Sequence, residues 1–300
     1  MTKQSNKKMK EKIKCPYCKN KNIVRRGQRK TQNRGLIQRY SCQDCEKRFV
    51  VDDGFFKMKN APQKVTLCLD LFYRGVSTRK VQEHLKAFYP HNSSWVSIYK
   101  WIVKYSNTIS KFTDTLKLKV GKEIQVDEME YKTKGKKSWF IDCIDTETRF
   151  MVSSNFVKMR GQNEIKKVIA RAKQKTDNKI KICTTDGFTA YSKVVKSVFG
   201  YNKTLKQFNV IHNKVTQLKN EGFNHKVERM HSNIRERTKV FRGFGSLEGA
   251  NALMKGYEVF YNFIRKHQAI NCCPYELACP ELKLGINKWL DLIKLSKANN

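Results

Sequence analysis

Three acidic residues in the second half of the chain could act together as metal ligands. Asp127 lies in the middle of an apolar run that reads as a strand over 123–131. A carboxylate in such a run is costly unless it is paired or binds a metal. Asp186 follows a second apolar run, 179–185, at the strand end where open α/β sheets present ligand groups. Glu228 lies one turn inside a predicted helix, so the three are candidate catalytic carboxylates.

That helix is predicted from the amphipathic stretch HKVERMHSNIRERTKVF. Glu228, His231 and Arg235 share one stripe of it at positions i, i+3 and i+7. His231 could orient a phosphate or a metal-bound water, or it could be hydrogen-bonded to a neighbouring side chain. Arg235 and Lys239 face the same way and could contact backbone phosphates of DNA, whereas Arg237 is expected to be a solvated base on the helix surface.

Four of the ten cysteines form two Cys-x-x-Cys pairs separated by 23 residues. Each pair can place two thiolates on one tight turn, and two such turns supply the ligands of a tetrahedral zinc ion. The residues between the pairs read as a β-hairpin with a basic, glycine-containing turn. We therefore predict a zinc ribbon that holds one structural Zn²⁺, and its ligands are Cys15, Cys18, Cys42 and Cys45.

The charge of the chain favours a polyanionic partner. Its 62 lysine and arginine residues against 26 aspartate and glutamate residues give a formal net charge of +36. Such an excess is typical of nucleic-acid binding. No apolar run is long enough to span a membrane, and the basic start of the chain has no apolar segment typical of a secretion signal. We expect a cytoplasmic protein.

Residues 62–112 predict three helices with a glycine turn between the first two. Ser77 is a plausible N-cap of the second helix, and Ser93 or Ser94 of the third. This pattern on a basic chain suggests a helix-turn-helix. An ordinary three-helix packing unit is the alternative. In the first interpretation the side chains that face DNA are Ser94, Ser97 and Lys100.

From residue 121 onward the pattern alternates strands and helices in the order β-β-β-α-β-α. This order predicts an α/β (α+β) fold with a ribonuclease-H-like mixed sheet flanked by helices. The predicted elements are three strands (123–131, 138–145 and 149–157), a helix (161–176), a strand (179–185) and a helix after Gly187. Four further acids, Glu128, Glu130, Asp142 and Asp145, are expected to be solvated or paired.

Three phrases, QVDEMEY, TTDGFTAY and VERMHSNIRERTK, resemble the acidic motifs of DDE transposases and retroviral-type integrases. Within that class the chain most resembles insertion-sequence transposases, which have a His three residues and a Lys or Arg seven residues after the glutamate. The resemblance extends from the cysteine pairs to about residue 280, and its motifs are specific in combination rather than singly. It implies that Asp127, Asp186 and Glu228 form the catalytic triad.

The resemblance implies a metal-dependent reaction on DNA, in a nucleoid-associated protein of a prokaryotic cell. Three carboxylates can hold two Mg²⁺ ions, for which Mn²⁺ may substitute. We expect cleavage that frees a 3′-OH at each element end, followed by attack of that hydroxyl on target DNA. The expected partners are double-stranded DNA, as terminal inverted repeats and as target, and further copies of the chain, in a homodimer or higher oligomer that pairs two ends.

The third carboxylate has a second candidate. Raw spacing from Asp186 favours Glu221, with 34 intervening residues, over Glu228, with 41, because the family commonly has the shorter interval. Local pattern favours Glu228, since Glu221 is followed by Gly222 and precedes the helix. We prefer Glu228, with an insertion around 203–220.

The same patterns predict four segments and leave alternative functions open. A transposase-derived DNA-binding regulator without activity is the main alternative, and a ribonuclease-H-like nuclease that acts on RNA or hybrids is a third.

The expected segments are a zinc ribbon with a basic arm (1–58), a helix-turn-helix domain (59–115), a catalytic domain (116–280) and a helical tail (281–300).

Overall fold

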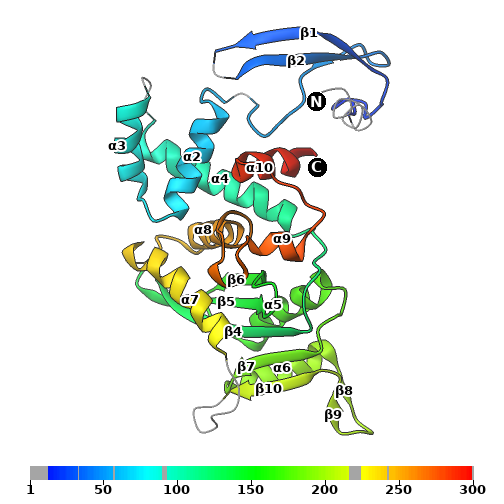
Figure 1. The fold of residues 1–300 in the computed structure, drawn as a ribbon, viewed down its shortest axis with the longest axis vertical. Coiled ribbons are helices and arrows are strands. Elements are labelled where there is room, and N and C mark those ends of the chain that lie inside the picture. Colours follow the sequence, from blue (N-terminus) through cyan, green and yellow to red (C-terminus); the bar gives the residue numbers. More distant parts are fainter. Residues whose placement is uncertain are drawn as a thin grey trace. The chain divides into compact units, whose positions relative to one another are not determined.

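The computed structural model describes residues 13–32, 34–56, 58–89, 93–215, 224–241 and 243–298. The chain forms two compact units (Figure 1). One runs to Val65 and includes the last residues from Lys297, and the other is Thr66–Ser296. The boundaries expected between helical segment, core and tail fall inside the second unit and stay predictions.

The first unit contains a small antiparallel sheet in the order β1-β2-β3. Its strands are β1 (Ile23–Thr31), β2 (Gly35–Cys42) and β3 (Arg48–Phe49). The predicted hairpin is confirmed, with Ile23 paired to Cys42 at its base. Gly35, which begins β2, has a φ of 66° that favours glycine. The small core contains Cys15, Cys42 and Phe49.

The helical segment has three helices, α2 (Pro62–Tyr73), α3 (Thr78–Phe88) and α4 (Trp95–Thr113). Ser77 caps α3, since its hydroxyl accepts a hydrogen bond from the backbone N–H of Lys80. Ser94 caps α4 by accepting from the N–H of Ser97. Both predicted caps are confirmed, and Ser94 rather than Ser93 is the cap of the third helix.

The large sheet has five strands in the order β10-β7-β4-β5-β6. The strands are β4 (Glu123–Thr133), β5 (Lys136–Asp145), β6 (Met151–Val157), β7 (Ile182–Asp186) and β10 (Ile211–Val215). Strands β4, β5 and β6 form an antiparallel meander, and β7 is parallel to both β4 and β10. The predicted ribonuclease-H-like mixed sheet is confirmed.

The segment around 203–220, expected to be an insertion, also supplies the fifth strand. After α6 a two-stranded hairpin of β8 (Tyr201–Asn202) and β9 (Gln207–Phe208) precedes β10 at the sheet edge. The sequence signal for β10, IHNKV, is weak because the strand lies at an edge and most of its side chains are exposed or half-buried.

Helices cover both faces of the sheet (Figure 1). Helices α5 (Gln162–Lys175) and α6 (Thr189–Phe199) pack together, with α5 against β5 and β6. On the other face α7 (His225–Thr238) packs on β4 and β5, and α8 (Leu247–Val259) on β6 and α4. The side chains of β4 therefore alternate between two helical layers.

The C-terminal part continues from α8 through a turn of π-helix (Phe260–Ile264) and a short 3₁₀-helix (Gln268–Ile270) to α9 (Pro274–Ala278) and α10 (Lys288–Ala298). Helix α10 packs on α2, where the indole N–H of Trp289 donates to Asp70 at 3.2 Å and its ring stacks on Tyr73. Nowhere in the described ranges does a helix combine the length and apolar character needed to cross a membrane.

Candidate active site

Asp127 and Asp186 lie side by side on neighbouring parallel strands. Val126 of β4 is in register with Thr185 of β7, so the next residue of each strand is an aspartate. Ligand oxygens of Asp127, Asp186 and Glu128 all lie within 4.8 Å of one another. This carboxylate group is hereafter called the acidic cluster, and the side chain of Asp127 is 19% exposed within it. Carboxylate oxygens in this arrangement suit Mg²⁺.

Glu128 joins the cluster from the opposite face of β4. Its carboxylate accepts hydrogen bonds from the hydroxyl of Tyr191 on α6 and from Arg160, whose Nη1 lies 2.5 Å away. The guanidinium of Arg160 in turn lies over the rings of Trp139 and Phe188, at 4.3 and 4.6 Å from their centroids. Glu128 was expected to be solvated or paired, and of the two it is paired, with a side chain only 3% exposed.

His231 ties the helix α7 to the two central strands. Its Nε2 lies 2.9 Å from Asp142 Oδ2 on β5, and its Nδ1 lies 3.5 Å from Asp127 Oδ2 on β4. Asp142 and Asp127 are paired in the β4–β5 register, so both face α7. His231 is 4% exposed and Asp142 is fully buried. Of the two interpretations of His231, the structure favours a histidine bonded to a neighbour, within reach of a cluster carboxylate.

Burial and these contacts together shift the pKa values of Asp127, Asp142 and His231. Burial raises the pKa of Asp127 to about 7, against the opposing effect of His231. Burial also raises the pKa of Asp142, again against His231. Burial alone would lower the pKa of His231, but the facing carboxylate of Asp142 outweighs it and the pKa is raised. The raised pKa of His231 is therefore due to the carboxylate of Asp142, the closest acid to its ring.

Glu228 lies outside the acidic cluster. Among the described residues, the third carboxylate of the cluster is that of Glu128. The helix of Glu228 begins against β4, because Gln125 Oε1 accepts hydrogen bonds at 3.1 Å from the backbone N–H groups of Lys226 and Val227. Glu228 is the next residue, one turn before His231, and its side chain is exposed. The competing candidate Glu221 lies outside the described residues.

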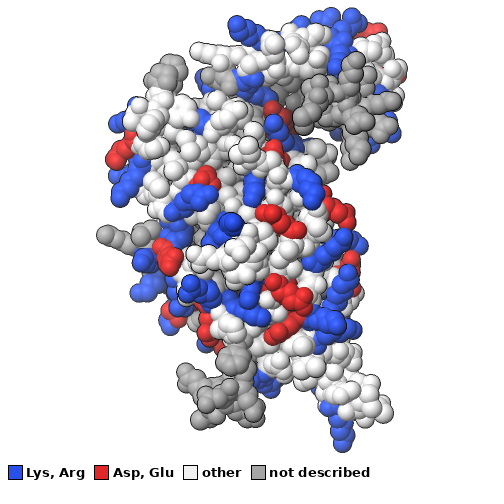
Figure 2. All heavy atoms as spheres, viewed as in Figure 1, with Lys and Arg blue, Asp and Glu red and all other residues white. Residues whose placement is uncertain are grey.

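The candidate DNA-contacting residues differ in solvent exposure and in whether their side chains contact one another. Lys100, Arg235 and Lys239 are exposed. The hydroxyls of Ser94 and Ser97 lie 3.1 Å apart at the start of α4. Basic side chains are spread over much of the face drawn in Figure 2, with acidic side chains among them.

The expectation for Arg237 is wrong. It is 6% exposed rather than solvated, and its guanidinium lies 4.3 Å from the ring centroids of both Phe72 and Phe241. The helical pattern of α7 could not show this, because the two rings come from α2 and from the turn after α7. The sequence held a signal for two site residues that were not singled out. Glu128 follows Asp127 directly, and Asp142 lies opposite Asp127 in the predicted meander.

The four predicted zinc ligands come together in the first unit. Cys15 Sγ lies 3.6 Å from Cys45 Sγ, and Cys18 Sγ lies 3.5 Å from Cys42 Sγ. All four sulfurs lie within 4.8 Å of one another, and the cluster can hold a zinc ion.

The segment that contains the acidic cluster matches a known family. Residues 121–268 match the family model of a DDE domain, the IS240 transposase type. Among solved structures the chain is similar to the catalytic core domain of HTLV-2 integrase in complex with magnesium. The trimeric form has 16% identity and a TM-score of 0.38, over 54% of this chain and 98% of that one. The dimeric form has 17% identity and a TM-score of 0.37, over 52% and 94%.

The chain is also similar to part of a simian T-cell lymphotropic virus intasome in complex with PP2A regulatory subunit B56 gamma. That match has 12% identity and a TM-score of 0.40, over 71% of this chain and 73% of that one. No curated protein matches the chain.

Proposed function

We propose that this chain, whose residues 121–268 form a DDE transposase domain of the IS240 type, cleaves the ends of a mobile DNA element and joins them to target DNA. The observation that carries the proposal is the placement of Asp127 and Asp186 at adjacent positions of parallel strands, with their oxygens within 4.8 Å of each other and of Glu128. A hydrolytic and a transesterification step at phosphodiesters need such a constellation.

The catalytic carboxylates in this proposal are Asp127, Asp186 and Glu228, and together they would hold two Mg²⁺ ions. Carboxylate oxygens are the ligands that Mg²⁺ prefers, and the structure brings Asp127 and Asp186 together with Glu128. Glu228 would join the two aspartates from α7. When bound, such ions activate the attacking oxygen and stabilise the leaving oxygen. Glu228 is preferred as third member because α7 begins against β4, with Gln125 holding its first N–H groups.

The other residues of the site have supporting roles. His231, held by Asp142, keeps Asp127 in place from the α7 side. Arg160 and Tyr191 hold Glu128 from the α6 side. The exposed Arg235 and Lys239, on and just after α7, would neutralise backbone phosphates of the bound strand.

The remaining segments would bind DNA. The zinc ribbon and the helical segment, with Ser94, Ser97 and Lys100 as contacts, would hold double-stranded DNA at the terminal inverted repeats. Pairing two element ends needs at least two copies of the chain, so a homodimer or higher oligomer is expected. The net charge of +36 supports this assignment, because it favours phosphate contacts over the length of a duplex.

The test uses a plasmid that carries the gene and its flanks, incubated with Mg²⁺ or Mn²⁺ and scored for 3′-end cleavage and joining. Wild type should be active, and Asp186→Asn and Glu228→Gln should both be inactive while DNA binding survives. Glu221→Gln is the matched control and should stay active. Cleavage that persists in Asp186→Asn would refute the mechanism. Tight binding without cleavage in every form would support the inactive regulator instead.

Glu128→Gln tests whether the third cluster carboxylate is a ligand or a supporting residue. With Glu228 as the third catalytic carboxylate, Glu128→Gln should lower activity without abolishing it. Complete loss in Glu128→Gln together with full activity in Glu228→Gln would assign the third position to Glu128.

A further inference from the structure

A cavity of about 340 Å³, hereafter the lysine cavity, lies at the turn between β4 and β5. Four lysines line it, Lys134, Lys136, Lys137 and Lys158, and none of the described acidic residues is part of the lining. All four lysines are exposed. The lysine cavity is therefore a concave surface of positive charge, which favours an anionic partner.

Backbone hydrogen bonds fix the β4–β5 turn against the segment before α8. The N–H of Lys134 donates to the carbonyl of Phe244 at 2.9 Å, and the N–H of Phe244 donates to the carbonyl of Lys132 at 2.8 Å. Ser246 and Leu247, the N-cap and the first residue of α8, also line the cavity. The lysine side chains thus extend from a hydrogen-bonded frame, and the positive end of the α8 dipole adds to their charge.

Three of the four lysines have no acidic partner. Lys137 Nζ lies 3.0 Å from Glu130 Oε2 on the same hairpin. Lys134, Lys136 and Lys158 form no ion pair within the described part of the chain. Their charges are therefore available to an anion from outside the chain.

Lys134 occupies a backbone position that lysine disfavours. Thr133 and Lys136 are paired at the end of the hairpin, so Lys134 and Gly135 alone form the turn. Their φ values are 49° and 76°, as a type I′ turn requires, and such positions favour asparagine, aspartate and glycine. The side chain of Lys134 is exposed, so no packing contact offsets this strain. Strain of this kind is often found where a side chain holds a ligand.

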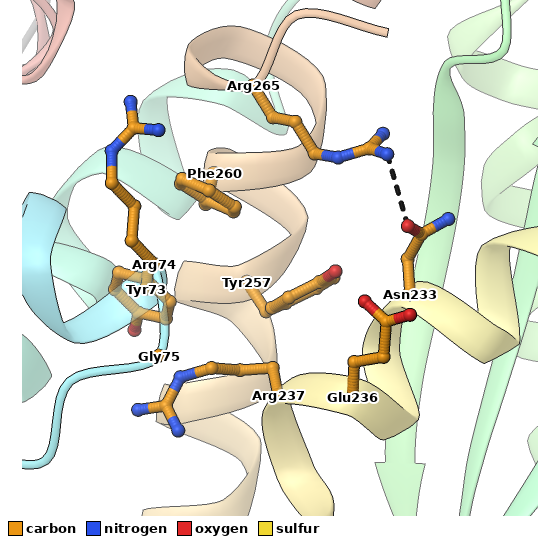
Figure 3. Close-up of a pocket in the computed structure, with 9 residues that line it drawn as sticks. All are labelled: Tyr73, Arg74, Gly75, Asn233, Glu236, Arg237, Tyr257, Phe260 and Arg265. Carbon is orange, nitrogen blue, oxygen red and sulfur yellow. Dashed lines mark hydrogen bonds between the residues drawn. The ribbon is translucent and has the colours of Figure 1, made fainter. Parts of the chain in front are cut away.

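A second cavity, of about 320 Å³, lacks this arrangement. Three arginines line it, Arg74, Arg237 and Arg265, against one acid, Glu236. Figure 3 shows the guanidinium groups of Arg237 and Arg265 on opposite sides of this cavity, with Tyr257 between them. One anion could not contact both, whereas the lysine cavity brings several cations to one place.

We propose that the lysine cavity binds a phosphate of the DNA backbone through Lys134, Lys136 and Lys158. Lysine is a point charge on a flexible stem, so several lysines around an open cavity can turn toward one phosphate. The inference deepens the proposed function and rests on it, because DNA is the polyanion assigned to this chain. Lys134 follows Asp127 by seven residues, about 23 Å along an extended strand or roughly seven base pairs of duplex. The phosphate therefore belongs to DNA that lies away from the cleaved bond.

The main experiment measures how the full chain binds a random-sequence 30-bp duplex at several salt concentrations, in buffer without Mg²⁺ or Mn²⁺. Each phosphate contact that is lost lowers the slope of log affinity against log salt by about one unit. Lys134→Asn should show this loss. No loss in this variant would overturn the proposal.

Lys206→Asn is the matched control for Lys134→Asn. Lys206 is an exposed lysine with a φ of 50°, in the loop between β8 and β9. The substitution therefore removes the same charge from the same kind of backbone position. It should keep the wild-type slope, and an equal loss in both variants would overturn the proposal, because the lysine cavity would then contribute no more than any exposed lysine.

Melting temperature separates a binding role from a structural one. Asparagine tolerates a positive φ better than lysine does, so Lys134→Asn and Lys206→Asn should both melt about 1–3 °C above wild type. A higher melting temperature together with a lower salt slope is a result that a merely structural lysine would not give. A lower melting temperature in Lys134→Asn would show that this lysine stabilises the fold, and would overturn the inference.

Two further variants keep the test decisive. Lys158→Gln changes a lysine that follows β6 and leaves the β4–β5 turn as it is, and it should lose the same unit of slope. Asp186→Asn should keep the wild-type slope, since binding without metal needs no cleavage. Failure of the catalytic proposal would thus leave the binding result intact, and unchanged slopes in the lysine variants would leave the catalytic proposal intact.

Discussion

The Nε2 atom of His231 lies 2.9 Å from Asp142 Oδ2, although the two residues are 89 positions apart in the chain. This contact joins α7 to β5 in the interior, and the other ring nitrogen reaches Asp127. It links the helix that carries Glu228 to the strand that carries the first catalytic aspartate. The histidine is thus a positioning residue for the proposed site.

Asp142→Asn should weaken catalysis without removing a metal ligand. The asparagine keeps the shape of the side chain but loses the carboxylate that pairs with His231 and raises its pKa. His231 then holds Asp127 less firmly. Mutation of a residue that orients a metal ligand typically lowers activity or metal affinity by about 10–100-fold. Activity is measured across a Mg²⁺ titration from pH 6 to 9. Asp145→Asn is the control, because Asp145 is bonded to Thr148 and to the N–H of Gly121 rather than to the site. A larger loss in the control would contradict the role of Asp142.

Asp127 makes the metal-free protein less stable as pH rises. The pKa of Asp127 is about 7 in the folded chain, against an ordinary value of 3.8 that applies to the unfolded chain. Between these two pH values the folded chain therefore binds more protons than the unfolded chain. The contribution of Asp127 to stability is therefore full below about pH 4 and is lost as pH rises through 7. In the presence of a chelator at pH 8, the free energy of unfolding of Asp127→Asn should be higher than that of wild type by roughly 1–4 kcal/mol. Urea unfolding at pH 5 and pH 8 measures this, and equal stability at pH 8 would count against it.

Breaking the Glu128–Arg160 pair should be more costly than breaking an exposed pair. Arg160→Gln leaves the nearly buried carboxylate of Glu128 with Tyr191 as its remaining donor, and we expect a loss of roughly 2–4 kcal/mol in unfolding free energy. Lys137→Gln breaks the exposed pair with Glu130 and should cost less than about 1 kcal/mol. Urea unfolding of both variants tests the difference. Similar losses in unfolding free energy would show that the Glu128–Arg160 pair stabilises the fold no more than an exposed pair does.

Zinc removal should affect the first unit alone. A chelator or Cys42→Ser should unfold the small sheet, since a ribbon of this size depends on its metal, and should release one zinc per chain. Limited proteolysis should then cut the region before Val65 while the second unit resists. Cys272→Ser, at a half-buried position outside the four-cysteine cluster, is the control and should keep the zinc. A zinc content well below one per wild-type chain would refute the site.

Local pattern predicted much of this molecule. The spacing of the cysteine pairs predicted the four-sulfur cluster, and period-two runs predicted the meander that contains Asp127. The hydroxyls of Ser77 and Ser94 predicted two helix starts. These features depend on residues within one turn, hairpin or strand, so a single stretch of sequence is enough to specify them.

Other features depended on tertiary structure. Pairing of His231 with Asp142 needs the β4–β5 register and the placement of α7 over it. Burial of Arg237 needs aromatic rings from two other elements, although its helical position alone reads as exposed. The sequence by itself thus determined the elements and the types of residue that could do chemistry. Which charges are buried and which carboxylates meet was decided only by packing, because desolvation depends on neighbours distant in the chain.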